Sequence, residues 1–249
     1  MIDEIKELEK QIKEYVINTA KAKGVVIGMS GGKDSLICAK LCANAIGKEN
    51  VLGLIMPNNS QKDVDTAIKS CKIIGIDYQI IDISDIYNDI IHSVKTVLDH
   101  KNITLNSITT INTQPRIRTN LLYAVGGSMN YLVVNTSNLS ETMIGYTTKW
   151  GDNVGDFSPI ANYTKTEVCK IGMELGLPKE LVQKTPEDAL SGKSDEENIG
   201  FSYDELDTYI RNGIKDTNFK KIENMHKYSN HKRLGVIKFK NNRTNYFDK

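Results

Sequence analysis

The sequence is poor in several residue types and patterns, and each shortage argues against a class of protein. Its four cysteines, Cys38, Cys42, Cys71 and Cys169, form no CxxC pair and have no histidine at ligand spacing. A structural zinc site or a disulfide framework is therefore not expected, and this cysteine usage is typical of a reducing, cytoplasmic setting. The net charge is only +1, so we expect no bulk electrostatic attraction to nucleic acid or to membranes.

Long apolar runs are also missing. No run approaches the roughly 20 residues that cross a membrane, and residues 1–23 are charged and helically patterned, so no signal peptide is expected. Hydrophobic content of 39% and charged content of 25% are ordinary for a globular protein. Because no repeat or low-complexity linker divides the 249 residues, we expect one domain. Its core should cover about residues 20–180 and its helical extension about 181–249.

Apolar runs alternate with helical patterns along the chain. The runs at 25–29, 51–56, 78–83 and 131–135 predict four strands, and a fifth is expected near 157–160 despite Pro159. Pro115 is expected to open a helix that reaches about Val125. The alternation predicts an α/β fold, a doubly wound parallel sheet of about five strands with helices on both faces. In such sheets the ligand lies outside the carboxyl ends of the strands.

The segment after the first strand carries the clearest functional pattern, Gly28-Met29-Ser30-Gly31-Gly32-Lys33-Asp34-Ser35. A strand, a glycine-rich turn and a helix N-terminus together form a phosphate site, because backbone N–H groups can approach oxygen atoms and the helix dipole favours negative charge. Asp34 adds a carboxylate where a hydrated Mg2+ could bridge to the phosphate. The alternative is a Gly-Gly turn that only joins a strand to a helix, and the complete order SGGxDS argues against it.

This loop is neither of the commoner nucleotide motifs. A Walker A loop has Ser or Thr after its lysine, whereas Lys33 precedes Asp34, and the dinucleotide fingerprint GxGxxG is absent. The order SGGxDS resembles the pyrophosphate-binding loop of the N-type ATP pyrophosphatases, which cleave ATP to AMP and pyrophosphate. That resemblance implies that residues 28–35 bind ATP and that Ser30, Asp34 and Ser35 stabilise the departing pyrophosphate.

Three further segments resemble the NAD synthetase family. Residues 136–156 are similar to its T-x-N-x-S-E stretch, followed by G-Y-x-T-K-[YW]-G-D and a later Asp. Residues 112–118 resemble its N-x-x-x-R-x-R helix start, and residues 194–207 resemble its S-D-E-x-x-[LI]-G-x-x-Y-x-x-[IL]-D block. The similarity covers nearly the whole chain, in order and with fitting spacing.

The resemblance implies an ammonia-dependent ligase that forms a C–N bond in the last step of NAD biosynthesis. ATP would adenylate the nicotinate carboxylate of deamido-NAD and release pyrophosphate, and ammonia would then displace AMP to give NAD. No covalent nucleophile is expected, because the substrate carboxylate attacks ATP directly. Only one helix precedes the first strand, so no glutaminase domain is expected. The family implies a homodimer.

The resemblance also implies roles for individual residues. The expected ATP-binding residues are Gly28, Met29, Ser30, Gly31, Gly32, Lys33, Asp34, Ser35, Thr136 and Lys165. Those expected to bind deamido-NAD are Arg116, Lys149, Asp156, His231 and Lys232, and the expected Mg2+ ligands are Asp34 and Glu141. Ordinary alternatives exist. Glu141 could simply interact favourably with the dipole at the N-terminus of its helix, and the charged residues of the loop and tail could be solvated. A cation such as Lys165 is poorly placed at a helix N-terminus, which favours a phosphate partner.

The chain departs from the family pattern at some positions. Asn135 replaces the usual Gly before Thr136, Pro115 replaces an Ala, and Glu187 stands where a hydroxyl residue near the ATP is common. Residues 185–200 are polar and acidic, and are expected to form a mobile loop.

Other functions fit part of the sequence. The loop alone would also suit GMP synthetase, asparagine synthetase or a tRNA thiolation enzyme, although the last typically uses reactive cysteines and a basic surface. A non-catalytic adenine-nucleotide sensor could share the fold. Such a sensor would need neither Glu141 nor the T-K-W-G-D run at 148–152.

Overall fold

A computed structural model of the chain describes residues 1–59, 63–183 and 194–239. Its centre is a parallel sheet of β1 (Gly24–Gly28), β2 (Val51–Ile55), β3 (Asp77–Ile80) and β4 (Tyr131–Val134), in the spatial order β3-β2-β1-β4. Val25 of β1 lies opposite Val51 of β2 on one side and Leu132 of β4 on the other. The strand order reverses beside β1, so a ligand crevice is expected outside the carboxyl ends of β1 and β4.

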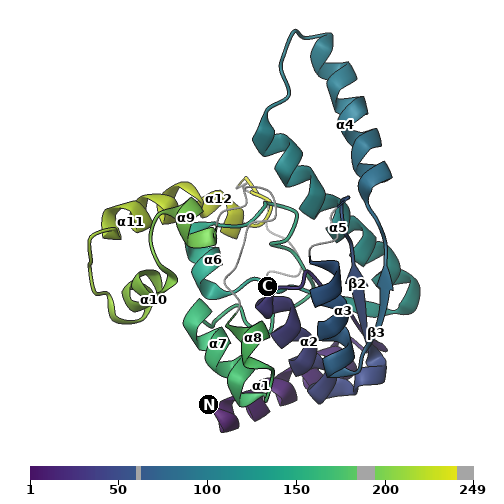
Figure 1. Cartoon of the computed structure of the whole chain (residues 1–249), viewed down its shortest axis with the longest axis vertical. Coiled ribbons are helices and arrows are strands. Elements are labelled where there is room, and N and C mark those ends of the chain that lie inside the picture. Colours follow the sequence, from purple (N-terminus) through teal and green to yellow (C-terminus); the bar gives the residue numbers. More distant parts are fainter. Residues whose placement is uncertain (60–62, 184–193, 240–249) are drawn as a thin grey trace.

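Helices connect and cover these strands (Figure 1). In chain order they are α1 (Ile2–Lys13), the π-helical turn η1 (Glu14–Thr19), α2 (Lys33–Ile46), the 3-10 turn η2 (Lys48–Asn50), α3 (Val64–Ile74), α4 (Ser84–Asp99), α5 (Ser107–Met129), α6 (Leu139–Ile144), α7 (Lys165–Glu174), α8 (Lys179–Val182), α9 (Asp195–Ile199), α10 (Tyr203–Asn212), α11 (Phe219–Tyr228) and α12 (Asn230–Arg233). Figure 1 shows α4 and the start of α5 extending away from the rest of the molecule as an arm.

Side-chain alternation along β1 builds a core on each face of the sheet. Val25 and Ile27 belong to a fully buried cluster that includes Leu36 of α2 and Ile171 of α7. Val26 points the other way, into a cluster formed with Ile117, Leu122 and other residues around α5. A strand that is apolar on both faces needs helices on both sides, and the predicted parallel α/β fold is therefore confirmed.

A third cluster joins the C-terminal helices to α6. Ile144 packs with Ile199, Phe201, Tyr203, Leu206 and Ile222, all of which are buried. The periodicity of α10 accounts for this, because Tyr203, Leu206 and Asp207 share one helix face and are its buried residues. The C-terminal helices therefore pack beside α6 and α7, on the side where β4 ends.

Three expectations about the elements need correction. The described sheet has four strands, and Phe157 makes only an isolated parallel bridge to Val134; Pro159 has no N–H to continue it. Helix α5 begins at Ser107, where the Asn106 side chain accepts a hydrogen bond from the Thr109 N–H at 2.8 Å, so Pro115 lies inside the helix. Within the predicted mobile loop, residues 195–199 are helical. Glu187 lies outside the described residues.

Candidate active site

A cavity of about 510 Å³ opens where the strand order reverses. Gly28, Met29 and Ser30 line it from the end of β1, and Thr136 lines it from the segment after β4. Helix α5 covers the cavity with several side chains, among them Arg118 and Leu122. Four of the residues predicted to bind ATP therefore share one cavity at the switch point of the sheet, as the rule for parallel sheets predicts.

The glycine-rich loop closes on itself through its own hydroxyl groups. The Ser30 Oγ accepts a hydrogen bond from the Gly32 N–H at 3.2 Å, and the Ser35 hydroxyl donates to the Gly32 carbonyl at 3.0 Å. Gly31 has φ +78°, and a Cβ there would lie 2.8 Å from the Asp63 carbonyl oxygen. The turn therefore requires glycine. It leads directly into the first turn of α2, an arrangement that favours an anion.

Lys33 differs from the other loop residues in where its side chain goes. The residue is buried, and its Nζ lies 3.7 Å from the Cys169 Sγ of α7. In this structure its ammonium group contacts α7, and its backbone belongs to the first turn of α2.

Three charged side chains from three helices meet beside the loop. Lys165 Nζ of α7 lies 2.8 Å from Asp34 Oδ2 of α2 and 2.7 Å from Glu141 Oε1 of α6. All three side chains are largely buried, with 6%, 18% and 16% of their surfaces exposed. Asn138 Nδ2 donates to Asp34 Oδ1 at 3.3 Å from the other side. We call Asp34, Glu141 and Lys165 the charge cluster.

Burial and mutual attraction set the protonation of the charge cluster. Burial and the nearby Asp34 raise the pKa of Glu141, while the Lys165 ammonium acts in the opposite direction. Burial alone would lower the pKa of Lys165, but the carboxylates of Glu141 and Asp34 hold that pKa well above its ordinary value. Lys165 is therefore charged at neutral pH, and one ammonium serves two carboxylates.

The donor chemistry of the charge cluster fits a divalent cation. Mg2+ prefers oxygen ligands and is commonly bound through one or two carboxylates together with substrate phosphates and water. The described residues contain no group of three His, Cys, Asp or Glu side chains able to hold a metal. Asp34 and Glu141, which converge on one positive charge, could supply two oxygen ligands for a metal whose remaining ligands come from phosphate or water.

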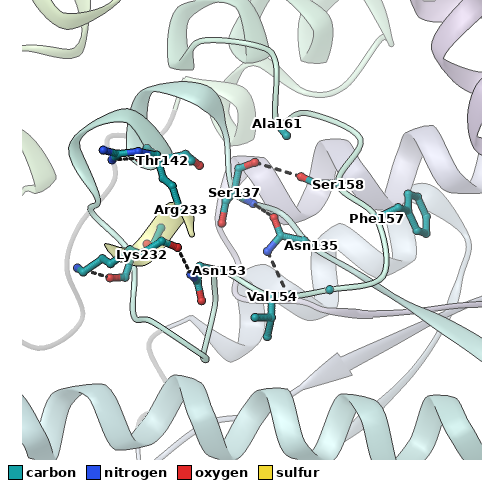
Figure 2. A pocket seen from close by; sticks show the side chains of 12 residues that line it. Asn135, Ser137, Thr142, Asn153, Val154, Phe157, Ser158, Ala161, Lys232 and Arg233 are labelled. Carbon is teal, nitrogen blue, oxygen red and sulfur yellow. Dashed lines mark hydrogen bonds between the residues drawn. The ribbon is translucent and has the colours of Figure 1, made fainter. Parts of the chain in front are cut away.

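A second cavity of about 440 Å³ lies between the segment after β4 and the C-terminal helices (Figure 2). Lys232 and Arg233 approach it from α12, and Ser137 and Asn135 approach from the end of β4. The Lys232 ammonium donates to the carbonyls of Gly145 and Thr147, both at 2.6 Å. The predicted tail residue Lys232 is therefore fixed against the loop that follows α6.

Asn135 connects the two cavities. Its side chain lines both, and its Nδ2 donates to the carbonyls of Asp152 and Val154 at 2.8 and 3.2 Å. Its Oδ1 accepts from the Ser137 N–H at 3.0 Å. Because Gly155 has no Cβ, the 152–155 segment can pack directly against Asn135. The departure from the family's usual glycine therefore supplies a side chain that orders this loop.

The other predicted binding residues lie apart from the charge cluster. Arg116 is exposed, and its Nε donates to the Lys149 carbonyl at 3.2 Å, so these two residues lie together. The Asp156 carboxylate accepts from the Val133 N–H at 2.7 Å, at the edge of β4. His231 is exposed on α12. None of these four belongs to the group of residues that lines either cavity.

Arg118 was not among the predicted site residues, yet it lines the larger cavity. Its Nε donates to the Met56 carbonyl at 2.9 Å, and burial lowers the pKa of its guanidinium. A helix turns by about 100° per residue, so Arg116 and Arg118 lie on different faces of α5. Leu122, one turn after Arg118, is buried, whereas Asn120, one turn after Arg116, is exposed. In the sequence, an apolar residue four positions after Arg118 and a polar one four positions after Arg116 therefore indicate that Arg118 points inward.

Sequence comparisons relate this chain to known proteins. The family model described as NAD synthase matches residues 4–235. An NH(3)-dependent NAD(+) synthetase from Finegoldia magna is 37% identical over 244 residues, covering 96% of this chain and 97% of that protein. One from Archaeoglobus fulgidus is 39% identical over 227 residues, covering 88% and 89%.

Solved structures are similar over most of their length. An NMN synthetase from Francisella tularensis has a TM-score of 0.83 at 29% identity, covering 94% of this chain and 98% of that one. An NH3-dependent NAD synthetase from Campylobacter jejuni has a TM-score of 0.76 at 25% identity, covering 95% and 99%. Within the described ranges, none of the helices combines the length and the apolar composition that a membrane crossing requires.

Proposed function

The chain belongs to the NAD synthase family, and from this premise we propose that it is an ammonia-dependent NAD+ synthetase. It is a ligase that uses ATP to activate a carboxylate and forms a C–N bond. The observation that carries the proposal is the charge cluster beside the phosphate loop, because it places one ammonium group and two carboxylates where pyrophosphate would leave.

In the proposed first step, an oxygen of the nicotinate carboxylate of deamido-NAD attacks the α-phosphorus of ATP. The bond to the β-phosphate oxygen breaks, and pyrophosphate leaves with that electron pair. Backbone N–H groups of residues 30–35 and the Lys165 ammonium would stabilise the negative charge that grows on the leaving group. We propose that Asp34 and Glu141 hold Mg2+, which would supply further charge neutralisation there.

In the second step, ammonia attacks the carbonyl carbon of the acyl adenylate. AMP leaves with its phosphate oxygen, and a proton is lost from nitrogen to give the amide of NAD. The proposed reaction needs no side-chain nucleophile, because the substrate carboxylate itself attacks ATP.

The two cavities support a division between the two substrates. We propose that the larger cavity takes the nucleoside of ATP, because it adjoins the phosphate loop and includes Thr136 and Arg118. The second cavity, with Lys232, is proposed to take part of deamido-NAD. The proposed contacts of the dinucleotide also include Arg116, Lys149, Asp156 and His231. Arg116, Lys149 and Asp156 lie around β4 and α5, which would suit the end of the dinucleotide farther from the ATP phosphates.

We propose that the enzyme is a cytoplasmic homodimer built from one domain per chain. The arm of α4 and the start of α5 supports a dimer, because it exposes Ile90, Val97, Ile108 and Ile111; apolar side chains gathered on a protruding element mark an interaction surface. All four cysteines are free thiols, as a reducing compartment would keep them. Sedimentation that shows an active, stable monomer would contradict the dimer.

The test is an assay of the purified chain with ATP, Mg2+, ammonium and deamido-NAD. We expect NAD, AMP and pyrophosphate in equal amounts. Asp34→Asn should abolish AMP formation, whereas Asp65→Asn, at an exposed acid in the first turn of α3, should not. Formation of ADP, or release of AMP only with a different acid, would contradict the proposal.

One structural neighbour makes a second substrate worth including. Because the Francisella tularensis structure is of an NMN synthetase, nicotinate mononucleotide should be tested beside deamido-NAD. We expect deamido-NAD to be the better substrate, since the curated relatives that cover most of the chain are NAD+ synthetases. Replacing ammonium with glutamine tests the nitrogen source in the same assay.

A further inference from the structure

Helix α10 places two buried side chains beside the first turn of α7, where Lys165 lies, although this helix is far from the phosphate loop in the sequence. Asp207 and Tyr203 each have only 5% of their surface exposed. They lie one turn apart on the buried face of α10, which packs against α6 and α7. A carboxylate is almost never this buried unless it is fully paired, so its partners indicate its role.

The partners of Asp207 are the first turn of α7 and the residue before Glu141. Its Oδ2 accepts from the Thr166 N–H at 2.8 Å, and its Oδ1 accepts from the Ser140 hydroxyl. The Ser140 Oγ in turn accepts from the Lys165 N–H at 2.9 Å. Asp207 thus satisfies one unpaired N–H of the α7 N-terminus directly and orients the hydroxyl that satisfies a second.

Tyr203 contacts the other end of the same lysine. Lys165 Nζ lies 5.2 Å from the centre of the Tyr203 ring, within range of a cation–π interaction. The Tyr203 N–H donates to Glu196 Oε1 at 2.7 Å, which holds the backbone at the start of α10. The backbone and the ammonium of Lys165 are therefore both held from α10.

We propose that Asp207 and Tyr203 are positioning residues that hold Lys165 at the site of adenylyl transfer, which makes α10 part of the active site. Ser140 directly precedes Glu141, so the hydrogen bond from the Lys165 N–H to Ser140 sets α7 against α6 and fixes the 2.7 Å contact between Lys165 Nζ and Glu141. The Asp207 carboxylate also offsets the cost of a lysine at a helix N-terminus. The role of Lys165 in the reaction rests on the proposed function.

The experiment is a double-mutant cycle between Asp207 and Lys165. Asp207→Asn keeps the shape of the side chain but removes its charge and one acceptor. A misplacement of about 1 Å can cost about 10²-fold in rate, so we expect kcat to fall about tenfold to a hundredfold and the ATP Kd to rise about tenfold. The KM for deamido-NAD should change less than about twofold, because the proposed partner of Lys165 is the phosphate chain of ATP.

Glu205→Gln on the same helix is the matched control. Glu205 accepts hydrogen bonds from the Asn218 N–H and Nδ2 at 2.8 and 2.9 Å, so it holds the start of α11 and has no contact with Lys165. Its loss should lower the melting temperature and leave the ATP Kd within about twofold, as expected for a site outside the coupled group. Tyr203→Leu, which keeps apolar volume in the cluster, gives an independent second variant.

The decisive measurement is the ATP Kd of all four proteins of the cycle, determined with Mg2+ present. In the Lys165→Met background, Asp207→Asn should change the Kd less than about twofold, because coupled residues are not additive. A full additive loss in that background, or equal losses from Glu205→Gln and Asp207→Asn, would overturn the proposal. A wild-type chain that makes no NAD but shows the non-additive cycle would overturn the proposed function alone and support the placement of Lys165.

Discussion

Replacing Lys165 with methionine should destabilise the nucleotide-free protein and make its stability depend on Mg2+. Lys165 is the ammonium shared by Asp34 and Glu141, at 2.8 and 2.7 Å. Methionine has a similar apolar length but no charge, so the variant would leave two carboxylates, with 18% and 16% of their side chains exposed, facing each other. Like charges that lose both water and their partner are strongly unfavourable.

The expected magnitude follows from this burial. Removing one partner of a buried ion pair costs about 3–5 kcal/mol, and we expect a loss in that range from Lys165→Met. The exposed pair between Lys69 and Glu180, at 3.4 Å and with 54% and 65% of the side chains exposed, is the matched control. Lys69→Met should cost no more than about 1 kcal/mol.

Denaturant unfolding with and without Mg2+ measures both effects. A ligand that binds only the folded state adds about 2.7 kcal/mol at a hundred times its Kd, so Mg2+ should restore much of the stability of Lys165→Met. Wild type should respond less to Mg2+ alone, because Lys165 occupies the space between the two carboxylates. Since the pKa of Glu141 is already raised by burial and by Asp34, its protonation should shrink the deficit as pH falls, and the deficit should grow as pH rises.

The reasoning would be refuted by either of two results. One is a Lys165→Met protein that unfolds at the same denaturant concentration as wild type without Mg2+. The other is a destabilised variant that Mg2+ fails to stabilise, because then Asp34 and Glu141 do not form a metal site once the ammonium is gone.

Three further predictions concern the loop, the first turn of α7 and the larger cavity. Gly31→Ala should lower stability by about 1–2 kcal/mol and weaken ATP binding, because its φ is +78° and a Cβ would meet Asp63; calorimetry and denaturation measure both. Partial burial would raise the pKa of Glu167, but hydrogen bonds from Arg211 and the Thr164 N–H lower it. Glu167→Gln should therefore lower the free energy of unfolding at neutral pH. In unfolding curves measured over a pH series, the difference in stability from wild type should disappear as pH falls below the ordinary pKa of Glu and through the lowered one. Arg118→Met should weaken ATP binding more than deamido-NAD binding, with the opposite order for Arg116→Met, in titrations of each ligand.

The phosphate loop could be predicted from the sequence because the strand, turn and helix that form it are contiguous. Strand, turn and helix N-terminus occupy residues 24–35, and the hydrogen bonds that shape the turn join residues at most five positions apart. Helix α7 begins in the same local way, because the Thr164 side chain caps it and forms a capping box with Glu167. Local chemistry of this kind depends little on the rest of the chain.

Where contacts between distant residues decide how an element ends or which way a side chain points, the sequence signal was weak or misleading. Pro115 resembles a helix start, yet α5 begins a full two turns earlier, because Asn106 caps it and its later turns pack on the sheet. The expected fifth strand at 157–160 has only one bridge, to Val134. Arg116 and Arg118 belong to one motif, but only Arg118 lines the larger cavity, since the sheet lies on one side of α5.

By itself the sequence determined the alternation of strands and helices, the phosphate-binding loop and, through resemblance, the family. Periodicity and turn chemistry depend on residues that are close in sequence, so they can be recognised without knowledge of the fold. Only the tertiary structure decided which charges meet. Lys165 and Asp34 are 131 positions apart, and they come together because α2 and α7 pack on the same face of the sheet. Asp207 of α10 contacts Ser140 and the Thr166 N–H, on either side of Lys165, because the buried face of α10 packs against α6 and α7, and no local pattern encodes those contacts.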